Sequence, residues 1–204
     1  MTLTMIRGEE TIDFTMKRQM IEVPTIEHEM LENQVGYIMI TEFDGVTDEQ
    51  FTAALTELQN QGMKSLVIDL RNNGGGSVES VCNIADELLP EGAIVYTEYK
   101  GKEREARNSD KECIKLPMSV IINGASASAS EILSGALQDY GVATIVGTQS
   151  YGKGIVQSIF DLQDGTALKL TTAKYYTPNG NDIHGVGITP DVEIDLPEEL
   201  KTEV

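Results

Sequence analysis

The stretch from Met118 to Ile132, MSVIINGASASASEI, decides the fold that we expect for this chain. Its first five residues are largely apolar and β-branched, which is typical of a buried strand. Asn123 and Gly124 break this strand, and small residues then lead into residues 128–140, where apolar side chains recur at helical spacing. A strand, a tight turn and a helix in this order can expose a serine hydroxyl at a helix N-terminus, where unpaired N–H groups and the helix dipole favour negative charge.

A second turn, SYGKGIVQ from Ser150 to Gln157, follows a short predicted strand at residues 144–147. Lys153 stands between two glycines, directly before the apolar residues that begin the next strand. This is an unusual place for a solvated charge, although an exposed turn lysine is the plain structural alternative.

Strands alternate with helices along most of the chain, and this alternation predicts an α/β fold. Residues 100–112 are almost wholly charged or polar and are predicted to form a solvated loop. Apolar runs predict strands at residues 36–43, 65–70, 94–96, 118–122, 144–147, 155–162 and 167–176, the last two joined by a hairpin turn at Asp164-Gly165. Earlier helices are predicted to begin at Thr47, with Gln50 completing a capping box, and at Ser77.

Period-two alternation on both sides of a turn predicts a two-stranded ribbon within residues 2–19. Such a ribbon is too small to be stable alone, so it pairs with the body of the protein or is what remains of another domain. Residues 21–26 contain Pro24 and are predicted to form a linker or an edge strand. We therefore expect a ribbon unit at residues 1–20, a core at 21–196 and an acidic tail at 197–204.

Composition limits the classes of function. The 204 residues suffice for one good core, and the formal net charge of −18 repels phosphate backbones and anionic membrane surfaces. We therefore expect no nucleic-acid partner. No apolar run approaches the length of a membrane span, and no signal peptide is recognised at the start of the sequence.

The cysteines and histidines do not form a metal-ligand pattern. Cys82 and Cys113 are read as small core or surface residues, and whether they are bonded to each other cannot be deduced from the sequence. His28 and His184 have no neighbouring serine or cysteine motif, which disfavours a histidine-based triad or a zinc site. We expect no metal and no cofactor.

The two turns together suggest nucleophilic chemistry. A serine hydroxyl needs a base, and lysine is a recognised partner when it is neutral, a state that burial in an apolar site favours. Lys153, between two glycines and before an apolar strand, is the candidate for such a site, and Gln157 is expected to point to the same face of an extended strand. A neutral amide there can orient the amine without holding it charged.

Acyl transfer also requires N–H groups that stabilise an oxyanion. The helix start at Ala129, next to Ser128, offers one set, and the glycine-rich turn Gly74–Gly76 between a strand and a helix offers another. Each signal is weak alone. The serines can simply cap the helix, and a glycine-rich turn can cradle a phosphate, although this one matches neither the P-loop nor the dinucleotide fingerprint.

Four separated blocks together resemble the C-terminal processing peptidases, also called tail-specific proteases. The blocks are Asp69–Gly76 (DLRNNGGG), Ser126–Ile132 (SASASEI), Gly152–Gln157 (GKGIVQ) and Gly187–Asp191 (GITPD). The resemblance covers roughly residues 20–195 and is specific because the blocks recur in the same order and spacing.

The resemblance implies a Ser–Lys serine protease on a crotonase-like or ClpP-like α/β core of stacked β-β-α units. It implies that Ser128 is the nucleophile, that Lys153 is the base and that Gln157 assists the lysine. The oxyanion donors then fall on the amide of Ala129 and on a glycine of the triple-glycine turn, Gly76 before Gly75. Asp139, which the residues alone suggest is a structural partner, matches a position that the family uses near its site.

The resemblance also implies partners that lie outside the visible motifs. Family members carry a PDZ domain before the core, and residues 2–19 look like its last strands. The implied substrate is an extended polypeptide that enters from its C-terminus and pairs with a sheet edge. The implied setting is extracytoplasmic and bacterial, and a homo-oligomer is compatible with it.

Two other functions remain open at this stage. The same core in the resembling retinoid-binding proteins binds apolar ligands, so a non-catalytic ligand- or peptide-binding module is the main alternative. A crotonase-like acyl-CoA enzyme would use the glycine amides without a nucleophile. The combination of Ser128, Lys153 and Gln157 argues against both.

Overall fold

The computed structural model describes residues 1–19, 22–110 and 112–197. Its largest unit is a six-stranded sheet in the order β12-β9-β8-β5-β4-β3, in which β3 runs antiparallel to β4 and the other neighbours are parallel. The strands are β3 (Ile26–Leu31), β4 (Val35–Ile40), β5 (Ser65–Asp69), β8 (Met118–Ile122), β9 (Ala143–Gly147) and β12 (Val192–Glu193). A 3₁₀ turn, η1 (Glu32–Gln34), joins β3 to β4.

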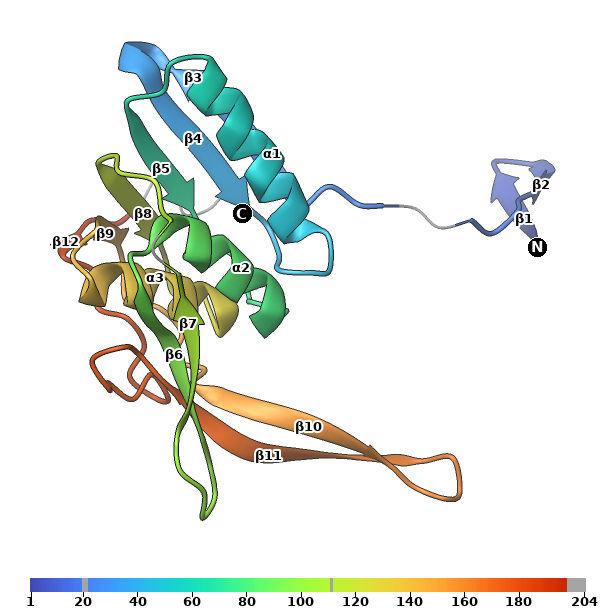
Figure 1. Cartoon of the computed structure of the whole chain (residues 1–204). Coiled ribbons are helices and arrows are strands. Elements are labelled where there is room, and N and C mark those ends of the chain that lie inside the picture. The colour runs from blue at the N-terminus through green and yellow to red at the C-terminus, as the bar shows by residue number, and fades with distance from the viewer. Residues whose placement is uncertain (20–21, 111, 198–204) are drawn as a thin grey trace.

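Three helices lie against one face of this sheet (Figure 1): α1 (Thr47–Asn60), α2 (Val78–Leu88) and α3 (Ala129–Asp139). Alternate strand residues point towards them and are buried, as in β4, where Ile38 and Ile40 are fully covered. These side chains meet the apolar stripes of the helices in one continuous core. The order of strands and helices confirms a mixed α/β fold.

A second, four-stranded antiparallel sheet has the order β10-β11-β6-β7. It consists of β6 (Gly92–Tyr99), β7 (Glu105–Ser109), β10 (Ile155–Asp161) and β11 (Ala167–Tyr176). The far end of the β10–β11 hairpin projects well beyond the helices, as Figure 1 shows. Among the strands that the structure describes, β10 is at the edge of its sheet, so β11 is its one neighbour there.

The N-terminal ribbon has the predicted form, with β1 (Thr2–Arg7) and β2 (Glu10–Thr15) paired antiparallel. Within the described residues it pairs with no other strand. Its origin in a PDZ domain stays a prediction, as do the crotonase-like description and the unit boundaries. The predicted acidic tail lies outside the described residues apart from Pro197.

Three local predictions were wrong or incomplete. The predicted solvated loop at residues 100–112 contains β7, because pairing with β6 gives this polar segment a place in a sheet. The predicted strand at 94–96 is part of the longer β6. Gln50 does not complete a capping box, because its Oε1 instead accepts a hydrogen bond from the Thr25 N–H at 2.9 Å.

No helix within the described residues is long and apolar enough to cross a membrane.

Candidate active site

Ser128 occupies a strained turn between β8 and α3. Its φ of 56° and ψ of −111° lie outside the regions that a residue with a Cβ normally adopts. A residue held in such a conformation needs support from its surroundings, and strain of this kind clusters at functional sites.

The support comes partly from the triple-glycine turn that follows β5. Asn73 is fully buried, and its carbonyl oxygen accepts hydrogen bonds from the Ala127 N–H at 3.0 Å and the Ser130 Oγ at 2.9 Å. Ser126, also fully buried, donates from its Oγ to the Leu70 carbonyl at 2.7 Å. The turn at residues 126–130, which we call the serine turn, is therefore fixed to residues 70–73 by three of its own residues.

The glycine turn lies directly against the predicted nucleophile. A Cβ added to Gly75 would lie 2.7 Å from the Ser128 Cβ and 2.9 Å from the Ala129 N, and the φ of Gly75 is +101°. Only glycine fits there without displacing the serine turn.

The hydrogen bonds separate the two glycine candidates for the oxyanion hole. The Gly75 N–H donates to the Asn73 Oδ1 at 2.8 Å and is therefore occupied. Among the described residues, nothing accepts a hydrogen bond from the N–H of Gly76 or of Ala129. These two groups remain available for a ligand oxygen.

A single buried carboxylate, that of Glu131, joins the serine turn to residues 150–153, which we call the lysine turn. Glu131 is 0% exposed, and its Oε2 accepts hydrogen bonds from the Ser128 N–H and the Lys153 N–H, both at 2.8 Å. Its Oε1 accepts from the Ser150 Oγ at 2.5 Å and the Gly152 N–H at 2.6 Å. Four donors offset the cost of burying this charge.

Glu131 was missed as a site residue in the sequence. The available signal was its position three residues after a serine at a helix start, the pattern of a capping box. That pattern explains the hydrogen bond to Ser128, but not the contacts with residues 150–153, which come from a different part of the chain.

The predicted catalytic residues line one groove of about 360 Å³. Gly76, Ser128, Lys153 and Gln157 all contribute, and the rest of the lining comes from Val78, Ile155, Val156, Ile159, Lys169 and Tyr175. Gln157 follows a register shift between β10 and β11, yet it still shares the groove with Lys153.

One expectation about this groove was wrong. Lys153 is exposed rather than buried in an apolar site. The two glycines that flank it are buried.

Asp139 does not line the groove. Its Oδ2 accepts a hydrogen bond from the Asn179 N–H at 2.7 Å, which fixes the turn after β11. This is the specific contact that its unfavourable place at a helix C-terminus suggested.

The two cysteines are free thiols, and Cys82 is buried in the core. Burial raises the pKa of the Cys82 thiol to about 11, so this group is not an activated nucleophile.

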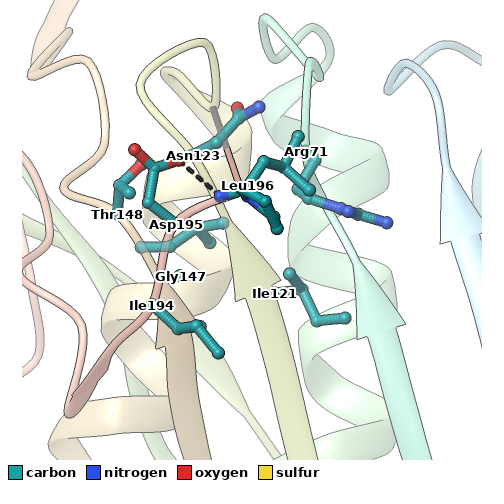
Figure 2. Close-up of a pocket in the computed structure, with 10 residues that line it drawn as sticks. Arg71, Ile121, Asn123, Gly147, Thr148, Ile194, Asp195 and Leu196 are labelled. Carbon is teal, nitrogen blue, oxygen red and sulfur yellow. Dashed lines mark hydrogen bonds between the residues drawn. The ribbon is translucent and has the colours of Figure 1, made fainter. Parts of the chain in front are cut away.

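A second hollow, of about 280 Å³, lies where β5, β8 and β9 end and is partly covered by residues 194–197 (Figure 2). It is mostly apolar and contains none of the predicted catalytic residues. Asn123, on its rim, exchanges hydrogen bonds of 3.0 and 2.9 Å with Asn72. This hollow therefore adjoins the residues that directly precede the serine turn and the glycine turn.

Asp69, Arg71 and Tyr37 form a hydrogen-bonded cluster at the end of β5, just before the glycine turn. Asp69 is 1% exposed and accepts hydrogen bonds of 2.6–3.0 Å from the guanidinium of Arg71 and one of 2.7 Å from the Tyr37 hydroxyl. Burial acts to raise the pKa of Asp69, but these hydrogen bonds outweigh it and hold the pKa below its ordinary value. Burial and the adjacent Asp69 raise the pKa of Tyr37 to about 12.

The groove thus brings together Ser128 in a strained conformation, Lys153 and Gly76 on a mixed α/β scaffold, and these are residue types that serine hydrolases use. The chain belongs to peptidase family S41, whose sequence pattern matches residues 34–194.

Two curated relatives are named probable CtpA-like serine proteases. The protein of Staphylococcus aureus strain COL is 39% identical over 201 residues, and the match covers 97% of this chain and 40% of the relative. The protein of Staphylococcus epidermidis is 37% identical, with 97% of this chain and 41% of the relative covered. The chain thus spans about two fifths of the length of these relatives.

Among solved structures, the photosystem II D1 C-terminal processing protease superposes with a TM-score of 0.79 at 33% identity, covering 94% of this chain and 54% of that protein. An S41 protease structure from Bacteroides fragilis superposes with a TM-score of 0.73 at 18% identity, covering 98% of this chain and 60% of that protein, and supports the fold alone.

Proposed function

We propose that this chain is the catalytic core of a serine endopeptidase of the C-terminal processing type. The observation that supports it most is the single groove shared by Ser128, Lys153, Gln157 and Gly76. Family membership and the processing proteases among its relatives agree with a peptidase.

In the proposed mechanism, the Ser128 Oγ attacks the peptide carbonyl while the neutral Lys153 amine takes the hydroxyl proton. The N–H groups of Ala129 and Gly76 receive the developing oxyanion. Lys153 then gives the proton to the leaving amine, and an acyl group stays on Ser128. Water, deprotonated by Lys153, hydrolyses this ester and restores the enzyme. Gln157 positions the lysine amine through these steps.

A bound peptide would supply the desolvation that the exposed Lys153 lacks in the open groove. We propose that the peptide extends along the free edge of β10, because four residues of that strand line the groove. Covering the amine with peptide favours its neutral form.

Several parts of the proposal concern the whole protein rather than this chain. They are a substrate cleaved near its C-terminus, a PDZ domain ending in the N-terminal ribbon, an extracytoplasmic location and a homo-oligomeric state. Their basis is the similarity to a family whose curated members are longer than this chain.

The test is labelling by a fluorophosphonate probe, followed by mass spectrometry to find the modified residue. We expect an adduct on Ser128 that is lost in Ser128→Ala and strongly reduced in Lys153→Ala and Lys153→Arg, since arginine does not deprotonate in proteins. Lys64→Ala, an exposed lysine outside the groove, is the matched control and retains labelling. Absence of any adduct, also in a chain extended to the length of the relatives, would favour a non-catalytic binding module.

A further inference from the structure

The groove continues beyond the catalytic residues. A hollow of about 350 Å³ adjoins it and shares Val78, Val156 and Tyr175 with it. The remaining lining comes from β6 and β7: Thr97, Tyr99, Glu105, Ala106 and Arg107. A peptide bound at Ser128 would enter this hollow, which we call the β7 subsite, by passing these three shared residues.

Arg107 is the cation of the β7 subsite. It lies on β7 opposite Val95 and, within the described residues, has neither a hydrogen bond nor an ion pair with a side chain. Among the Lys and Arg residues that the structure describes, only Arg71, Arg104 and Lys174 form ion pairs, and Arg107 is the one that lines this hollow. A guanidinium without an acidic partner is available for a ligand.

The positive charge reaches the floor of the subsite. Burial raises the pKa of Tyr175 to about 12, and Arg107 acts against that rise. Arg107 acts in the same sense on the buried Cys82. Glu105 also lines the subsite, but it has no such effect on the pKa of Tyr175.

The N-terminus of α2 adds to the positive electrostatic potential near Arg107. Val78, which lines both hollows, is the first residue of α2, and the Ser77 Oγ accepts a hydrogen bond from the Ser80 N–H at this end. The partial positive charge of the helix N-terminus therefore opens onto the same path as Arg107.

We propose that Arg107 is a specificity-determining residue that binds a carboxylate of the peptide substrate. This inference rests on the proposed peptidase function. The carboxylate belongs to an Asp or Glu side chain or to the peptide C-terminus, and the guanidinium binds either by charge-assisted hydrogen bonds. β7 lies three strand spacings from β10, about 14 Å, so the part of the peptide that reaches Arg107 leaves the edge of β10 and crosses the sheet over about four extended residues.

The experiment measures peptide binding to the Ser128→Ala chain by fluorescence polarisation, so that binding does not depend on cleavage. The peptides have an apolar background with one Glu or one Gln, scanned three to five residues on either side of the central bond. Each is prepared with a free and with an amidated C-terminus, which distinguishes the side-chain carboxylate from the terminal one.

We expect one Glu position, or the free C-terminus, to improve binding about tenfold over its neutral counterpart. Arg107→Gln removes this preference without weakening the neutral peptide, and Arg107→Lys retains part of it. Glu105→Gln, the matched control on the same face of the same strand, retains or increases it.

A preference that survives Arg107→Gln, equal binding of charged and neutral peptides, or no binding of any peptide overturns the inference. A preference for Lys peptides that Glu105→Gln removes overturns it as well. Cleavage by the chain with Ser128 intact tests the proposed function separately: cleavage without a charge preference refutes only the role of Arg107, whereas a preference without cleavage refutes only the peptidase.

Discussion

Replacing Glu131 by glutamine tests whether one carboxylate holds the serine and lysine turns together. The amide has a single acceptor oxygen, whereas the carboxylate receives four hydrogen bonds through two oxygens. Its NH2 group fits best on the Oε1 side, because the Ser150 hydroxyl can turn from donor to acceptor. The Gly152 N–H is then left facing a donor.

The cost follows from these contacts. An unsatisfied buried donor costs about 1–3 kcal/mol, and the two hydrogen bonds that remain on the Oε2 side each lose about 1 kcal/mol of charge assistance. We therefore expect Glu131→Gln to lower the free energy of unfolding by about 3–5 kcal/mol, a large part of a typical domain's stability.

The assay is urea denaturation followed by circular dichroism, together with cleavage of a fluorogenic peptide under conditions where both chains remain folded. We expect cleavage to fall at least tenfold, because Ser128 and Lys153 lose their common anchor. Glu49→Gln, at an exposed site in the first turn of α1, is the control and shifts stability by less than about 0.5 kcal/mol. Wild-type stability and activity in Glu131→Gln would refute the bridging role.

Three further predictions follow from individual contacts. Gly75→Ala places a methyl group against Ser128 at a positive φ, and we expect loss of labelling by the serine probe even where circular dichroism shows a folded chain. Because hydrogen bonds from Arg71 hold the pKa of Asp69 below its unfolded value, the stability that this carboxylate contributes is present above about pH 4 and is lost as the pH falls through the folded pKa. Denaturation between pH 5 and 3 is expected to show a smaller loss in Asp69→Asn than in wild type, and equal slopes would contradict this. Asp139→Asn weakens only the turn after β11, so melting is expected to shift by a few degrees while peptide cleavage is unchanged; a large loss of cleavage would place Asp139 in the mechanism.

The parts of the fold that the sequence predicts well are those specified by neighbouring residues. β8, the serine turn and α3 follow from one continuous pattern of apolar, small and helix-spaced residues, and α2 begins directly after Ser77, which caps it. The hairpin of β10 and β11 is likewise signalled by its turn.

The parts that the sequence does not reveal depend on distant partners. β7 carries mostly polar side chains and β3 carries as many polar as apolar ones; both are strands because β6 and β4 pair with them. Glu131 looks like a local capping residue until its contacts with residues 150–153 are seen. The choice of Gly76 over Gly75 as the available N–H also requires the Asn73 contact.

The most direct test of the proposed mechanism is a crystal structure of the chain with a peptide boronic acid, which forms a stable tetrahedral adduct with a nucleophilic serine. We predict a bond from boron to the Ser128 Oγ, with one boronate oxygen about 3 Å from the N–H groups of both Ala129 and Gly76 and the Lys153 Nζ about 3 Å from the Oγ. An adduct on another residue, or a Lys153 amine that stays in bulk solvent while boron is bound to Ser128, would contradict the Ser–Lys mechanism.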